Sequence, residues 1–170
     1  MNIQRMIKHF MTGSMAATAA FPVRSLQAIE QAIRETEASH VGQIRFAVEA
    51  SLDFAALRRN QTAAERAIEV FSQSQVWDTE HNNGVLIYLL LADRDVEIVA
   101  DRGIHARLGK AAWEAICRDM EAAFRLGNFE MGVVQGVSTV GSHLHQHFPR
   151  KPVTPDALPG NELPDKPIVL

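Results

Sequence analysis

A continuous apolar run at residues 85–91, VLIYLLL, constrains the fold of this chain more than any other feature. Seven apolar residues in succession, with Asn-Asn-Gly before them, are typical of a strand that is buried on both faces. A polar turn at 92–95 follows, and residues 96–100 then show the two-residue period of a second strand. The two runs together predict an antiparallel hairpin in the core.

The segments around the hairpin show strand and helix periodicity. Residues 43–50, QIRFAVEA, alternate in polarity and predict a strand with one buried face. In the helix that a capping box opens, the expected buried stripe is Ala64, Ala67, Ile68 and Phe71. Four helices are predicted: from Pro22 to residues 40–42, from Thr62 onward, over 107–126 and over 129–147.

This order of elements predicts an α/β fold, in which a small mixed β-sheet is sandwiched between α-helices. A length of 170 residues, 46% of them hydrophobic, accommodates one such domain with a tail at each end. We expect an amphipathic N-terminal segment at 1–20, the α/β domain at 21–148 and a Pro-rich extended tail at 149–170.

The N-terminal segment carries an apolar stripe at helical spacing, which comprises Ile3, Met6, Ile7, Phe10 and Met11. The simplest expectation is that this face docks on the chain's own domain, and the alternatives are a protein partner or a peripheral membrane contact. Polar residues interrupt the apolar region that a signal peptide needs, so a cytoplasmic location is expected. A periplasmic or membrane-associated location is the alternative if the N-terminus acts as a signal.

The C-terminal tail contains six of the seven prolines and ends in Ile168, Val169 and Leu170. Its composition predicts an extended segment that cannot form a core of its own. The apolar end indicates docking, either back on the domain or on a protein partner.

Several classes of function find little support in the sequence. A net charge of −3 without a basic patch argues against nucleic acid as a partner. The single cysteine, Cys117, lies in a helical pattern and is expected to pack in the core. The stretch GIHARLGK at 103–110 lacks the spacing of a phosphate-binding loop. His143 and His147 lie one helical turn apart, a spacing at which two imidazoles can bind Zn²⁺ or Ni²⁺ adventitiously. The alternative interpretation is a solvated helix end, where histidines are favourable because of the helix dipole.

Acidic and amide side chains at the predicted strand ends are the candidate site. Carboxylate and amide oxygens are the ligands that Ca²⁺ and Mg²⁺ prefer, and strand ends are where sites collect in α/β sheets. We therefore predict a shared cation site at one edge of the sheet, with five candidate ligands: Glu49, Asp78, Asn82, Asn83 and Asp101.

Four blocks of the sequence together resemble the TPM domain, a family of thylakoid-lumen and bacterial phosphatase-like proteins. The blocks are QIRFAVEA, FSQSQVW, NNGVLIYLLLADRDVEIVADRGI and GNFEMGVVQGVSTVGSHL, and the resemblance covers residues 25–148. Its compact length is similar to that of the short, free-standing bacterial members.

The resemblance implies an α/β sandwich with a mixed sheet. It also implies calcium binding, attributed to some members, and acid phosphatase activity, attributed to a plant relative. The family's turn and strand-end residues fall on Asn82, Asn83, Gly84, Asp101 and Gly103. Longer members have an acid before the first helix, where this chain has FPVRSL at 21–26 without one.

Two functions from different classes follow from these patterns. The favoured one is a non-catalytic interaction module that associates through its N-terminal helix or its C-terminal tail. The alternative is a weak acid phosphatase, a phosphomonoesterase assisted by Ca²⁺ or Mg²⁺. No catalytic nucleophile can be assigned from the sequence.

Overall fold

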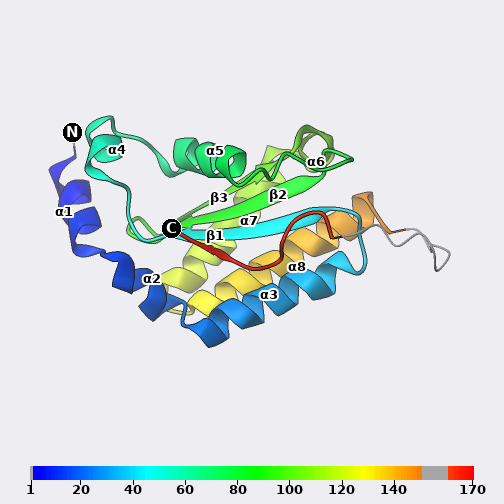
Figure 1. The fold of residues 1–170 in the computed structure, drawn as a ribbon, viewed down its shortest axis with the longest axis horizontal. Helices are drawn as coiled ribbons and strands as arrows, with labels where there is room; N and C mark the ends of the chain where they lie inside the picture. The colour runs from blue at the N-terminus through cyan, green and yellow to red at the C-terminus, as the bar shows by residue number, and fades with distance from the viewer. Residues whose placement is uncertain (1, 151–160) are drawn as a thin grey trace.

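The computed structural model describes residues 2–150 and 161–170 as helices packed on both faces of a four-stranded sheet (Figure 1). The predicted α/β class and the sandwiched mixed sheet are confirmed. The elements in chain order are α1 Ile3–Met11, α2 Ser14–Ala20, α3 Val23–Glu37, β1 Gln43–Glu49, α4 Phe54–Arg58, α5 Ala63–Gln73, β2 Gly84–Leu90, β3 Asp95–Ala100, α6 Arg102–Leu108, α7 Lys110–Arg125, α8 Phe129–His147 and β4 Ile168–Val169.

The sheet has the strand order β3-β2-β1-β4. β2 and β3 form the predicted antiparallel hairpin, and every residue of β2 is buried. β1 runs parallel to β2, with Gln43 opposite Gly84 and Glu49 opposite Leu90. β4, at the end of the chain, adds a short parallel strand to the free edge of β1. The carboxyl end of β1 therefore lies beside the carboxyl end of β2, and β3 runs in the opposite direction.

Two apolar layers separate the sheet from its helices. On one face, Ile44, Phe46 and Ile87 belong to a cluster that includes buried residues of α3, α7 and α8. On the other face, Leu86 and Tyr88 pack with residues of α4 and α5 (Figure 1). Because both faces are covered, all seven residues of β1 are buried. The prediction of one buried face for residues 43–50 is therefore wrong.

Two helix predictions need correction as well. The capping box at Thr62 forms, but the residues that α5 buries are Ala63, Ala67 and Val70, whereas Ile68 is 60% exposed. The predicted helix at 107–126 is preceded by a separate short helix, α6. The break falls at Gly109, whose φ of +75° is a backbone conformation that glycine adopts at little cost.

The glycines of α8 allow close contact with α7, as their spacing indicates. A Cβ atom at Gly132 would lie 2.7 Å from the ring of Phe124, and one at Gly136 would overlap the Met120 side chain. A larger residue at Gly132 would therefore have to displace the Phe124 ring, and one at Gly136 the Met120 side chain.

The described part of the C-terminal tail, residues 161–170, lies along the edge of the domain. Gln43 Oε1 accepts hydrogen bonds from the backbone N–H groups of Glu162 and Leu163, and Arg45 donates to the carbonyls of Pro164 and Lys166. Residues 151–160 of the predicted extended tail lie outside the described residues. The end of the tail thus folds back on its own domain.

Candidate functional site

The structure places the five predicted cation ligands at two ends of the sheet. Glu49 is the last residue of β1, whereas Asn82 and Asn83 immediately precede β2, which runs parallel to β1. Asp101 follows the antiparallel strand β3, and its N–H donates to Gly84 O at 2.9 Å. Six residue steps of about 3.3 Å separate the two ends of β1, so Glu49 lies about 20 Å from the other end of the sheet. The expectation that all these acids share one edge is therefore wrong for Glu49.

Glu49 is instead part of a buried polar contact on the α5 face of the sheet. Its carboxylate accepts two hydrogen bonds from Arg66, at 2.8 and 3.1 Å, and a third from the hydroxyl of Tyr88 at 2.6 Å. Burial, followed by the hydrogen bond to Glu49, raises the pKa of Tyr88, so the phenol stays protonated. Since both oxygens of Glu49 already have protein donors, the contact serves to join α5 to β1.

The opposite end of the sheet holds two buried oxygens without a hydrogen-bond donor in the described structure. Asn83 is 2% exposed, and its amide nitrogen donates to Val41 O at 2.6 Å while its Oδ1 has no partner. Asp101 caps α6 through Oδ1, which accepts from the Arg102 N–H at 2.7 Å, and its Oδ2 is buried and unpaired. Buried polar atoms normally have a hydrogen-bond partner, so these two oxygens are the candidate ligands at this end of the sheet.

The remaining predicted ligands at this end, Asp78 and Asn82, are exposed. Asn82 has a φ of +50° in the turn before β2, and a Cβ atom on Gly103 would lie 3.2 Å from its carbonyl oxygen. The start of α6 therefore packs directly on the Asn82–Asn83 turn.

The oxygen ligands at this end of the sheet suit a hard cation, but few of them are negatively charged. Amide, carboxylate and carbonyl oxygens are all suitable for Ca²⁺. Within residues 2–150 and 161–170, however, no three His, Cys, Asp or Glu side chains are grouped as a metal site would require. This holds for His143 and His147 too, whose pairing stays a prediction.

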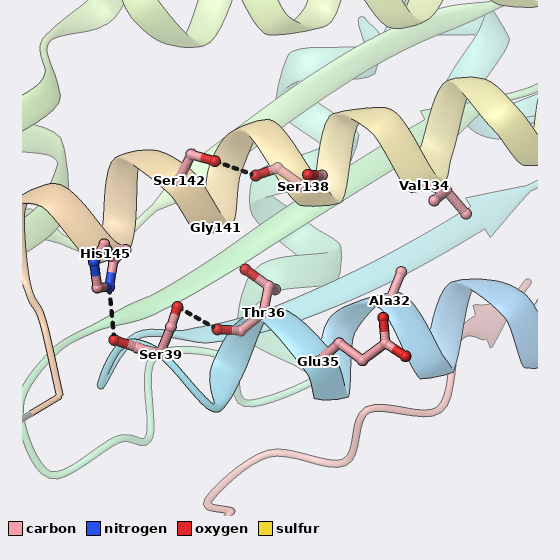
Figure 2. A pocket seen from close by; sticks show the side chains of 9 residues that line it. All are labelled: Ala32, Glu35, Thr36, Ser39, Val134, Ser138, Gly141, Ser142 and His145. Atoms are coloured by element: carbon pink, nitrogen blue, oxygen red, sulfur yellow. Dashed lines mark hydrogen bonds between the residues drawn. The ribbon is translucent and has the colours of Figure 1, made fainter.

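A pocket of about 510 Å³ lies between α3 and α8 (Figure 2). Two of its three serines donate to backbone carbonyls of their own segments: Ser142 to Ser138 at 2.9 Å and Ser39 to Thr36 at 2.8 Å. His145 lies with Nδ1 2.9 Å from the carbonyl of Ser39. The hydroxyl of Thr36, which also lines the pocket, lies 3.4 Å from Nε2 of His40. Neither of the two serine contacts pairs a hydroxyl with an imidazole, the contact that would activate a serine as a nucleophile.

The thiol of Cys117 is no nucleophile either. Burial, reinforced by Glu97 and Glu121, raises its pKa to about 12, so the thiolate is not formed at neutral pH. This agrees with the predicted packing role of that residue.

The N-terminal helix is held by its polar side. Arg5 donates to Asp93 at 2.8 Å and to the carbonyl of Gln61 at 2.8 Å, and His9 lies 3.0 Å from the same carboxylate. His9 is 3% exposed, and its Nδ1 accepts from the Leu52 N–H at 3.0 Å, so Nε2 carries the proton that faces Asp93.

The apolar side of α1 consequently points away from most of the core. Ile7 is 55% exposed and Phe10 is 92% exposed, and of the predicted apolar stripe Met6 packs against a core cluster. The expectation that α1 docks through its apolar face is thus wrong for most of that face. The hydrogen bonds of Arg5 and His9, four residues apart, determine the orientation instead.

Residues of α1 and α4 line an apolar groove of about 630 Å³. The two helices lie at one end of the molecule (Figure 1). We call the groove and its exposed rim the α1–α4 surface. Its lining residues are Ile3, Met6, Ile7, His9, Phe10, Thr12, Gly13, Ser51, Leu52, Phe54 and Leu57.

Helix α4 and the burial of His9 were not predicted from the sequence. The signal for α4 was Asp53, which caps this helix by accepting from the Ala56 N–H at 2.7 Å. For His9, the spacing to Arg5 marks a polar stripe, but its partner Asp93 lies more than 80 residues away in sequence.

Comparison with known proteins supports the fold described above. The chain resembles the BA42 protein of the psychrophilic bacterium Bizionia argentinensis, at 29% identity and a TM-score of 0.74, over 88% of this chain and 94% of that one. It shares its fold with the N-terminal domain of a P. gingivalis protein, at 23% identity and a TM-score of 0.57, over 69% and 72% of the two chains. No curated protein matches it. A family model for the TPM domain matches residues 17–143, and the chain therefore belongs to the TPM domain family.

Proposed function

We propose that this TPM domain protein is a non-catalytic interaction module that associates through the α1–α4 surface. The observation that carries the proposal is the orientation of α1, whose polar side faces the domain while Phe10 and Ile7 face outward. An amphipathic helix on a globular domain normally buries its apolar side. A helix that does the opposite exposes apolar surface, and a partner that covers this surface lowers the free energy.

The polar contacts that hold α1 on the domain support this proposal. His9 is almost fully buried and both of its ring nitrogens have partners, and Asp93 receives Arg5 as well. Charged hydrogen bonds of this kind contribute about 1.5–3 kcal/mol each when solvent is largely excluded. The exposed apolar side is therefore held in place by specific contacts rather than left over from a loose helix.

The contacts of the possible catalytic groups favour an interaction module over an enzyme. Glu49 is occupied by Arg66 and Tyr88, and the thiol of Cys117 is protonated at neutral pH. Ser39 and Ser142 of the α3–α8 pocket donate to backbone carbonyls. None of these groups is set up to attack a substrate or to activate water.

Phe10→Ser tests the proposal, with Ile68→Ser as the matched control. Both residues are exposed and helical, at 92% and 60%, but Ile68 lies on α5 outside the α1–α4 surface. We expect Phe10→Ser to reduce association at least fivefold, measured as self-association by light scattering or as partner recovery in a pull-down. The Ile68→Ser protein should behave as wild type. Equal association of all three proteins would contradict the proposal.

A second candidate function rests on the unpaired oxygens of Asn83 and Asp101. We propose, as the alternative, that these residues hold Ca²⁺ or Mg²⁺, with Asp78 and Asn82 beside them and Glu49 excluded. A divalent cation held there would neutralise charge on a phosphate ester. Calorimetric titration with Ca²⁺ tests the binding, and hydrolysis of a chromogenic phosphomonoester tests the activity. Equal values for wild type and Asp101→Asn in both assays would exclude this alternative.

A further inference from the structure

The apolar residues of the α1–α4 surface project from it. Phe10 is 92% exposed, Ile3 64% and Ile7 55%, so much of each side chain is in contact with solvent. Phe54, at the start of α4, is 66% exposed on the other side of the same groove. A partner that covers this surface must therefore accept apolar side chains that extend into it.

Cationic side chains occur on the same two segments of the chain as these apolar residues. Residues 2–29 contain no Asp or Glu. The side chain of Lys8 is 52% exposed, although it lies 3.7 Å from Asp93. Arg58 and Arg59, at the end of α4, are exposed and form no salt bridge within the described part of the chain. The acid on α4, Asp53, is engaged as the cap of that helix.

From this combination we infer that the α1–α4 surface docks on an anionic phospholipid bilayer. The inference rests on the proposed function and names its partner. An interfacial helix with projecting aromatic and aliphatic side chains, flanked by Lys and Arg, inserts its apolar side at the boundary between headgroups and acyl chains. Lipid phosphates attract the cations beside it. Among the residues that the structure describes, no helix is long and apolar enough to cross a membrane.

The charges favour a bilayer over a protein partner. A protein that covered Arg58 and Arg59 would have to supply carboxylates at fixed positions, or the desolvated guanidinium groups would weaken the complex. A bilayer supplies phosphates at any lateral position, and it lets the long cationic side chains remain in the headgroup layer. The α1–α4 surface can therefore bind a bilayer without acidic groups at fixed positions in the partner.

Cosedimentation of the full chain with vesicles tests the inference. The vesicles are phosphatidylglycerol mixed equally with phosphatidylcholine, and phosphatidylcholine alone. We expect binding to the anionic vesicles to be at least tenfold stronger than to the neutral ones. Phe10→Ser should lower it about tenfold, and the double variant Arg58→Ser, Arg59→Ser about 25-fold, because each cation near the surface contributes about fivefold.

Matched controls separate this surface from general charge and hydrophobicity. Ile68→Ser removes an exposed aliphatic side chain elsewhere, and the double variant Arg102→Ser, Arg118→Ser removes two exposed cations from α6 and α7. Both should bind anionic vesicles within twofold of wild type. Circular dichroism of every variant should match wild type, because all the replaced side chains are exposed.

Three outcomes would overturn the inference: no binding to anionic vesicles, equal binding to both vesicles, or equal losses in the controls. The light-scattering and pull-down assays then decide about the proposed function separately. If Phe10→Ser impairs those assays while vesicles do not bind, the partner is a protein and the proposed function stands. If Phe10→Ser changes nothing in any assay, both fail.

Discussion

The two terminal segments of this chain are attached to the same domain in opposite ways. The C-terminal segment, residues 161–170, buries Leu163 and places Ile168 against the core, while its backbone is held by Gln43 and Arg45. The N-terminal helix α1 is held by charged and polar side chains and leaves Phe10 outside. The comparison teaches that an apolar terminal sequence does not by itself identify a docking surface, because its own domain can already cover it.

The consequence for function is a division of roles. The tail covers the edge of β1, and a free strand edge is a site of unwanted pairing. We therefore assign the tail to the integrity of the sheet. The outer side of helix α1 makes few contacts with the domain, so it is accessible to a partner.

The largest effect is expected when the anchor of the tail is removed. Arg45→Met would leave the carbonyls of Pro164 and Lys166 without their donor and remove a cation near Asp165. We expect a loss of about 3 kcal/mol in the free energy of unfolding, because a buried charged network is broken on one side. Urea denaturation measures it, and Lys166→Ala, an exposed change in the same segment, should cost less than about 0.5 kcal/mol. Equal small losses would mean that the tail is as loosely attached as its composition indicates.

A distinct pH dependence of stability is expected at Glu37. Burial raises its pKa to about 8, against the hydrogen bond from the Ile44 N–H, and Asp165 adds to the rise. The folded state thus retains a proton that the unfolded chain releases near pH 4.5, so stability should fall as the pH rises from about 4.5 to 8. Glu37→Gln should flatten this decline, because an amide oxygen still accepts from Ile44 without a proton to lose. Urea midpoints at pH 5 and pH 8.5 measure it, and an unchanged slope would refute the assignment.

The anchor of α1 should show a weaker effect with the opposite pH dependence. Burial would raise the pKa of Asp93, but hydrogen bonds from Arg5 and His9 outweigh burial and lower it. The stabilisation is therefore present above the ordinary carboxyl pKa and is lost as the pH falls through the lower folded value. Asp93→Asn should cost about 1.5 kcal/mol, chiefly in local stability. Hydrogen exchange at the Leu52 amide, which donates to His9, measures it; unchanged protection there would show that α1 does not depend on Asp93.

Much of the fold could be predicted because its signals are local. The apolar run of β2 with the turn after it, the Thr62–Glu65 capping box and the periodicity of 129–147 each depend on neighbouring residues. The burial of both faces of β1 could not be predicted in this way. It depends on where α5 and the tail pack, and both are distant in sequence.

The candidate site was harder to predict because strand direction decides which residues meet. A helix between β1 and β2 already indicates a parallel pair, and in such a pair Glu49 and Asn83 lie at opposite ends. That signal was present in the sequence and would have separated them. The orientation of α1 was not predictable, since its sequence contains both a polar and an apolar stripe, and only the distant Asp93 determines which one faces the domain.

The central claim is that the apolar side of α1 faces outward in the folded protein, and thiol labelling tests it most directly. Phe10→Cys and Ala17→Cys introduce cysteines at an exposed and a buried position, 92% and 1% exposed, on adjacent helices. Under native conditions we expect the cysteine at position 10 to react with a maleimide at least a hundredfold faster than the one at position 17, with Cys117 slow in both proteins. Equally slow labelling at positions 10 and 17, in a protein that remains folded, would contradict the account.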